Sequence, residues 1–286
     1  MQPRTTYWRK NANRLLQVFS WLAVASALCA MLCIIGTVLL RGGKALSFDF
    51  LTHRSVPYGV ADGGIGNAVL GTLAITGGAA LIAIPMALLA GIFMTEFNAG
   101  RRLLALLRFS ANVMMGMPSV LVGLFIYMAV VVPCGHFSGF AGSLALALLM
   151  FPVILRTTED ILNMVPNTLR ESALALGMSR TRATLAIVCR SARNGLLTGV
   201  LLSVARVSGE TAPLLFTALF ADSWIDSYFK APTPSLPVLI TEYTTNSPFA
   251  AMHLQGWGAA LVVMALVLSL NLFARFLFKD KKGHGN

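Results

Sequence analysis

Two ionisable residues, Arg206 and Glu210, lie in the middle of a long apolar segment, residues 195–219. The segment is long enough to cross a bilayer, and each charge costs about 2.5–3.5 kcal/mol at a bilayer centre on insertion scales. At a rise of about 1.5 Å per residue, Arg206 lies roughly 16 Å from Gly195, about halfway through a ~30 Å hydrocarbon core. Some interaction must therefore offset the cost of these charges.

The residue types around this position define the chemistry that it could support. A guanidinium is a planar, permanently charged donor that suits the oxygens of an oxyanion. Ser203 and Thr211 add hydroxyl donors, and the Glu210 carboxylate could accept a proton. A structural role stays open, because residues at i and i+4 meet on a helix, and Arg206 and Glu210 would then neutralise each other and lower the insertion cost.

The pattern predicts that this helix has one small and polar face. At about 100° per residue, seven residues fall within about 80° of one another: Gly195, Gly199, Ser203, Arg206, Glu210, Pro213 and Thr217. The remaining positions are mostly Leu, Val and Ala. We therefore expect the helix to face a pathway or a partner rather than lipid.

The composition is that of an integral membrane protein. Of 286 residues, 56% are hydrophobic and 12% are charged, whereas soluble domains have about 25% charged residues. The four Cys show no disulfide or metal-site spacing, and no nucleic-acid-binding module accompanies the net charge of +11. Charge-poor stretches predict an all-α bundle of six membrane-spanning helices, at about residues 15–40, 68–95, 109–132, 140–155, 195–219 and 256–278.

The distribution of Lys and Arg predicts the orientation of these spans. Four basic residues fall in 1–14, three in 101–108, six in 156–193 and four in 275–282, whereas the opposite side holds four. The positive-inside rule then places both termini in the cytoplasm. We expect a cytoplasmic arm over residues 1–14 and a cytoplasmic tail over residues 279–286.

The connection between the fourth and fifth spans, residues 156–194, is too long for a simple turn. Thr168 and Glu171 have the spacing of a capping box, which predicts a short helix over 169–176. Gly177 is placed to end that helix in the left-handed conformation. Because so short a helix is marginal in water, we expect it to dock on its own bundle or on a separate protein.

A motif in this connection resembles the EAA loop of permease subunits of ATP-binding-cassette importers. It consists of Glu171, Ser172, Ala173, Gly177 and Ile187. Ser172 stands where the family usually has Ala, and Cys189-Arg190 stands where it usually has Leu-Pro. The resemblance implies that the loop is a coupling helix received by a groove in an ATPase. The residues that would couple to the ATPase are Thr168, Glu171, Ser172, Ala173 and Gly177.

Other stretches resemble the A-type permeases of phosphate-specific importers of this class. They are residues 156–159, 205–218, 236–238 and 257–260, within a resemblance that covers about 46–278. It implies a six-helix type I importer permease in a bacterial inner membrane, surrounded by lipid, with phosphate as substrate. The implied partners are a homologous C-type permease, two copies of an ATPase subunit and a periplasmic phosphate-binding protein. ATP and Mg would bind to the ATPase, since this chain has no G-x4-G-K-[ST] motif.

The resemblance also assigns roles to single residues. Phosphate near neutral pH carries both negative charge and a proton, so its pathway needs a cation, hydrogen-bond donors and preferably a carboxylate. Arg206, Glu210, Ser203 and Thr211 would supply these groups, and Glu210 could accept the proton that fully ionised sulfate lacks. Arg156 is a further pathway residue on the family resemblance, although its position alone is typical of an interfacial anchor.

Three other functions remain as alternatives. A permease for another oxyanion, such as sulfate or molybdate, would use the same cation. A stand-alone secondary transporter is expected to show internal repeats, which the sequence lacks, and it would leave the predicted cytoplasmic helix unexplained. A non-transporting scaffold would not explain the charged Arg206 in the middle of an apolar span.

Overall fold

The computed structural model describes residues 4–60, 63–97 and 100–277, and every regular element in these residues is a helix. The all-α fold class predicted from the sequence is therefore confirmed. The predicted tail, 279–286, and the end of the predicted sixth span, 278, lie outside the described residues, as do residues 1–3 of the predicted arm.

Five helices in the described residues are long and apolar enough to cross a membrane. They are α1 (Arg4–Gly42), α3 (Gly66–Glu96), α7 (Gly139–Asn163), α13 (Ala250–Leu277) and a continuous helix that joins α9 (Arg180–Ala183), a π-helical turn (Thr184–Val188) and α10 (Cys189–Val207). The shorter helices are α2 (Phe48–Thr52), α4 (Arg101–Gly116), α5 (Ser119–Ile126), α6 (Val132–Cys134), α8 (Asn167–Ala175), α11 (Ala212–Thr217) and α12 (Leu236–Thr241).

The predicted third span, 109–132, is not one straight helix. It is divided between α4 and α5, which meet at a bend of 103° and supply a sixth span if the pair is counted together. The bend follows from Pro118, because the residue before a proline is pushed out of the helical region. Met117 is accordingly extended, with φ −74° and ψ 135°.

The predicted fifth span, 195–219, is also interrupted. α10 ends at Val207 and α11 begins at Ala212, so residues 208–211 separate two helices. Pro213 accounts for the break, since a proline removes a backbone donor and its ring clashes with the carbonyl four residues earlier, here that of Gly209. The single polar helix face expected over this span therefore ends with α10.

α3 and α7 pack against each other at the centre of the molecule. α3 contributes buried alanines at every fourth position, Ala79, Ala83 and Ala87. A Cβ added at Gly91 would lie 2.6 Å from the Cγ2 atom of Thr158 on α7, and small residues allow helices in a membrane to approach this closely. α4 and α10 pack on α7 as well, so α7 adjoins both elements that carry the candidate site.

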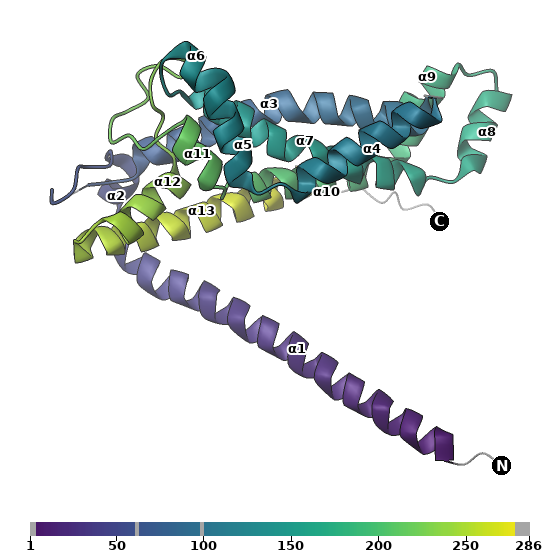
Figure 1. The fold of residues 1–286 in the computed structure, drawn as a ribbon, viewed down its shortest axis with the longest axis horizontal. Helices are drawn as coiled ribbons and strands as arrows, with labels where there is room; N and C mark the ends of the chain where they lie inside the picture. The colour runs from purple at the N-terminus through teal and green to yellow at the C-terminus, as the bar shows by residue number, and fades with distance from the viewer. Residues whose placement is uncertain (1–3, 61–62, 98–99, 278–286) are drawn as a thin grey trace.

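α1 projects away from the other described helices, and its C-terminal part packs on α13 (Figure 1). At that contact, the Arg41 guanidinium lies 5.2 Å from the centroid of the Trp257 ring. The helix already begins at Arg4, so the described residues of the predicted arm, 4–14, are helical and continuous with the predicted first span. Its apolar side chains are exposed in the isolated chain, as expected for a helix that meets lipid or a partner.

The segments around α2 and α12 form a packed layer at one end of the bundle. Phe50, Leu236 and Tyr243 share a buried cluster there. Tyr58 donates a 2.5 Å hydrogen bond to the Glu242 carboxylate. Burial and this hydrogen bond raise the pKa of Tyr58 to about 12. α8 and α9 lie at the opposite end of the bundle (Figure 1).

Candidate functional site

Arg206 lies in the last turn of α10, and Glu210 lies in the break between α10 and α11. Their closest charged atoms, Arg206 Nε and Glu210 Oε1, are 3.9 Å apart, and the two side chains are 63% and 22% exposed. This distance is too long for a hydrogen bond, and no side-chain hydrogen bond of Arg206 is found among the described residues. The pair is therefore a loose ion pair, exposed in the isolated chain, in which the guanidinium donors are available to another group.

A cavity of about 230 Å³ lies beside this pair. Arg206 and Glu210 form its charged part, and Leu149 and Val153 of α7 form one wall. The remaining wall comes from the bend between α4 and α5: Met114, Met115, Met117, Pro118 and Ser119. Two interrupted helices thus face one cavity, which fits the rule that non-helical backbone at membrane depth lines a cavity or is buried in protein.

The surroundings of the cavity favour an anion. The Arg206 guanidinium borders the cavity, and a guanidinium is a permanently charged donor that suits the oxygens of an anion. The first residue of α5, Ser119, borders the cavity, so the partial positive charge at that helix N-terminus lies at the same place. Among transporters, discontinuous helices that place such ends near the midplane are typical of substrate sites.

Ser203 and Thr211 lie apart from this cavity lining. Ser203 is 1% exposed, and its hydroxyl is directed at the Met150 carbonyl of α7, at 3.5 Å. The Thr211 hydroxyl is 3.5 Å from the Pro237 carbonyl, and the Thr211 carbonyl accepts hydrogen bonds from the first turn of α11. The structure therefore brings together Arg206 and Glu210 but not the two hydroxyl residues predicted beside them.

Arg156 belongs to an ion-pair cluster that the sequence reasoning missed. α7 continues to Asn163, well past the predicted end of the fourth span at 155, so Arg156 lies inside the helix. Its Nη1 is 2.6 Å from Oε2 of Glu159, and Nε of Arg108 on α4 is 2.6 Å from Oε1 of the same carboxylate. Glu159 is 2% exposed. Two guanidinium groups thus share one buried carboxylate, which leaves one net positive charge.

This cluster continues the α7 surface that borders the cavity. Leu149, Val153 and Arg156 are spaced at i, i+4 and i+7, so they lie on one helix face. The signal for Glu159 was available in the sequence, because it follows Arg156 at i+3 on a helical repeat. The partner Arg108 on another helix could not be found from spacing alone.

The short helix of the connecting segment, α8, begins earlier than predicted. It spans Asn167–Ala175, with Pro166 at the position before it, so Thr168 lies inside the helix and does not cap it. The predicted capping box is therefore wrong. Pro166 explains the difference, because its fixed φ and its carbonyl, which accepts the Leu169 N–H, start the helix first.

The predicted end of this helix is confirmed. Gly177 has φ +79°, which is the left-handed conformation that glycine adopts without steric cost. The Gly177 N–H donates to the Leu174 carbonyl, and the Met178 N–H donates to the Ala173 carbonyl, as in a Schellman motif. The chain therefore turns sharply after α8 and enters α9.

α8 exposes most of its surface. Ala173 is its buried residue, whereas Thr168, Glu171 and Ser172 are exposed. Exposed apolar side chains accompany them on and beside the helix: Met164, Leu169, Leu174 and Leu176. Such a group of exposed apolar residues rimmed by polar ones is typical of a protein-interaction surface.

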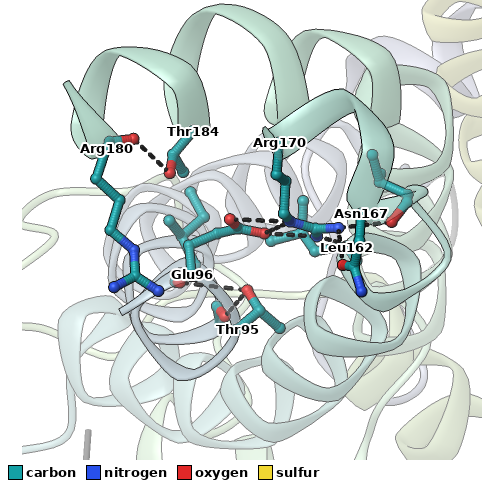
Figure 2. Close-up of polar contacts among 10 residues, drawn as sticks. Thr95, Glu96, Leu162, Asn167, Arg170, Arg180 and Thr184 are labelled. Atoms are coloured by element: carbon teal, nitrogen blue, oxygen red, sulfur yellow. Dashed lines mark hydrogen bonds and ion pairs between the residues drawn. The ribbon is translucent and has the colours of Figure 1, made fainter. Parts of the chain in front are cut away.

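One side chain of α8, Arg170, reaches back into the bundle (Figure 2). Its Nε and Nη2 lie 3.0 and 2.7 Å from Oε1 of Glu96, the last residue of α3. Nη2 also donates to the Leu162 carbonyl, and Nη1 donates to the Val165 carbonyl and to the Asn167 side chain. Arg170 therefore joins α8 to the ends of α3 and α7.

Comparison with known proteins identifies the class of this chain. Residues 83–282 match the family model described as binding-protein-dependent transport system inner membrane component. The chain therefore belongs to this family of transport components, and within it to the group of phosphate transport system permease proteins called PstA, with which it shares most of its length. It is a multi-pass inner-membrane permease.

Two relatives illustrate this similarity. The phosphate transport system permease protein PstA of Haemophilus influenzae is 42% identical over 276 residues, which cover 96% of this chain and 97% of the relative. That of Yersinia pestis is 38% identical over 275 residues, covering 96% and 92%.

A solved structure shows the same fold. It is a chain of the MetNI methionine ABC transporter, in a structure of its inward facing conformations. The TM-score is 0.62 at 16% sequence identity, and the match covers 75% of this chain and 94% of that one. The fold is therefore that of a type I importer permease.

Proposed function

We propose that this chain is the A-type permease subunit of an ATP-driven phosphate importer and forms half of its translocation pathway. The observation that carries the proposal is the cavity between two interrupted helices, with Arg206 and Glu210 at its charged end. The PstA relatives, which are named as phosphate transport permeases, support phosphate as the substrate.

The pathway role rests on Arg206 and Glu210, with Arg156 as a second cationic position. The loose ion pair favours the pathway over a structural lock, because a lock is expected to bring the charged atoms into hydrogen-bond contact. Arg156, with Arg108 and Glu159, would receive the anion farther along the same α7 face. Ser203 and Thr211 would act by holding α10 and α11 in place rather than by contact with phosphate.

The coupling role rests on α8. Its exposed residues Thr168, Glu171 and Ser172, together with Ala173 and the Gly177 turn, would fit a groove of the ATPase subunit. The complete importer would contain a homologous C-type permease, two copies of that ATPase and a periplasmic phosphate-binding protein. ATP and Mg would bind to the ATPase, so this chain would need no cofactor of its own.

The proposed orientation places α8 and both termini in the cytoplasm. Two of the basic segments counted in the sequence lie on α4 and on the segment from α7 to α10, close to the end of the bundle that carries α8. The α2 and α12 layer would then face the periplasm, where it could meet the phosphate-binding protein.

Replacing Arg206 by Gln tests the pathway role. The variant keeps the length and polarity of the side chain but removes its charge, so we expect phosphate uptake to be abolished while the importer still assembles. The measurement is uptake of labelled phosphate by cells that depend on this importer, with co-purification of the subunits as the check on assembly. Arg190→Gln, on an exposed position of α10, is the matched control. Near-normal uptake by Arg206→Gln would rule out the pathway role.

A further inference from the structure

A largely buried ion pair attaches α8 to the end of α3, in addition to the contacts of α8 with α9 and the turn at Thr184–Val188. α8 buries only Ala173 among its own residues, so apolar packing holds it weakly. The Arg170 side chain is 21% exposed and that of Glu96 is 6% exposed. Figure 2 shows the Glu96 carboxylate pointing toward Arg170, with Arg180 on the other side of it.

The guanidinium of Arg170 uses its donors on three separate parts of the chain. A guanidinium has five N–H donors in a fixed planar fork. Those of Arg170 reach the Glu96 carboxylate, the Leu162 and Val165 carbonyls and the Asn167 side chain. The two carbonyls lie at and just after the end of α7, where backbone acceptors lack helical partners. Every donor is therefore engaged, and this one side chain ties α8 to the ends of both α3 and α7.

α3 and α7 connect this contact to the core of the bundle. They pack together along the core cluster of Ile75, Ala79, Met150 and Ile154. At the far end of α3, the Leu236 N–H of α12 donates a 2.8 Å hydrogen bond to the Thr72 hydroxyl. α7 in turn is joined to α4 through Glu159 and Arg108, and α4 leads to the bend that borders the cavity.

We propose that Arg170 and Glu96 form the joint that makes α8, α3 and α7 move as one body when the ATPase moves α8. Arg170 is then a positioning residue for transport and not a contact of the ATPase or of phosphate. This inference rests on the proposed function, because it assumes that α8 is the element which the ATPase moves.

The joint predicts uncoupling when it is broken. In the Arg170→Gln variant, α8 can still follow the ATPase, but its displacement is no longer passed to α3 and α7. We therefore expect phosphate uptake to fall about tenfold while ATP hydrolysis stays within about twofold of the wild type, since coupling energies of a few kcal/mol correspond to changes of this size. Arg170→Lys is expected to behave similarly, because an ammonium lacks the planar fork that reaches the carboxylate and two carbonyls together.

The experiment uses the complete importer in proteoliposomes, with its partner permease, ATPase and phosphate-binding protein, and measures uptake and hydrolysis on the same preparation. Glu96→Gln breaks the joint from the other side and keeps the test valid if Arg170→Gln fails to assemble. Arg180→Gln is the matched control, because Arg180 is exposed and lines a second cavity of about 160 Å³ together with Glu96 and Arg170, but no hydrogen bond or ion pair joins it to Glu96.

The outcomes separate the joint from the proposed function. Uncoupling in the Arg170 and Glu96 variants, with coupled transport in Arg180→Gln, supports the joint. Unchanged uptake in those variants, or a loss of uptake and hydrolysis in equal proportion, overturns it. A wild-type importer that hydrolyses ATP but takes up no phosphate would instead contradict the proposed function.

Discussion

At the residue scale, the charged side chains of this chain differ in how firmly they are held. Arg170 and Glu96 are mostly buried and fully engaged, whereas Arg206 and Glu210 make a long, exposed contact. A buried charge is costly unless it is paired and hydrogen-bonded, so the first pair must stay closed for the fold. The second pair can open at little cost, as a group that binds a transient anion must.

Glu159 provides a prediction at this scale. Glu159→Gln removes the carboxylate that two guanidinium groups share, so Arg108 and Arg156 would repel each other across the α4–α7 contact. Both arginines are partly exposed, which reduces the effect, and we expect a loss of roughly 1–3 kcal/mol of stability. The measurement is the thermal unfolding temperature of the purified importer in detergent.

The control for this prediction is the neighbouring residue. Asp160→Asn removes one negative charge from an exposed position on the same helix, and it is expected to leave the unfolding temperature unchanged. Equal unfolding temperatures for the Glu159 and Asp160 variants would show that the shared carboxylate does not stabilise the α4–α7 contact.

At the element scale, the breaks in two helices create the cavity. Each of the two broken spans consists of a first arm, α4 or α10, and a second arm, α5 or α11. Pro118 follows the end of α4, and Pro213 interrupts the span that α10 begins. A Cβ added at Gly123 of α5 would lie 2.6 Å from the Cα atom of Pro213, so the second arms of the two broken spans are in close contact. Two straight helices would not leave the same opening beside Arg206.

The close contact between these two arms leads to a prediction. Gly123→Leu would force α5 away from α11, because backbone atoms of Pro213 occupy the space that the new side chain needs. We expect the variant to assemble less well and to lose most of its phosphate uptake. Gly77→Leu, on α3 where no neighbouring atom lies within 4 Å, is the control. Wild-type uptake by Gly123→Leu would mean that the packing of the two arms does not shape the pathway.

The turn after α8 supports a second prediction at the element scale. An added Cβ at Gly177 meets no atom within 4 Å, so only its φ of +79° opposes a side chain. Gly177→Ala should therefore cost about 1–2 kcal/mol at this turn and reduce co-purification of the ATPase subunit. Asn tolerates the left-handed conformation better than Ala, so Gly177→Asn is expected to be milder.

The control for the Gly177 prediction is a glycine with a negative φ. Gly100 precedes α4 with φ −53° and also has no neighbouring atom within 4 Å. Gly100→Ala is expected to retain the ATPase. If Gly177→Ala retains it equally well, the left-handed turn is not required for docking.

At the scale of the whole molecule, two exposed features bear on the proposal that the chain forms one half of a pathway. The apolar surface of α1 is exposed along most of its length, and the Arg206 side chain is 63% exposed in the isolated chain. Both features fit a subunit that functions in a membrane and in an assembly.

The choice of substrate is a property of the complete importer. A carboxylate beside the guanidinium favours an oxyanion that carries a proton, because Glu210 would repel a fully ionised one. We therefore expect excess unlabelled phosphate, but not excess sulfate, to compete with the uptake of labelled phosphate by the complete importer. Competition by sulfate as strong as that by phosphate would favour a permease for a different oxyanion.

The sequence by itself determined the membrane class, the charged pair within an apolar span and the glycine turn after α8, because each depends on residue type and local spacing. Only the tertiary structure decided how the two broken helices face each other, which of the polar residues border the cavity, and that Arg108 and Glu96 find their partners on distant helices. The physical reason is that helical periodicity relates residues within a few turns. Proline breaks end that periodicity, and the packing of small residues sets which helices meet.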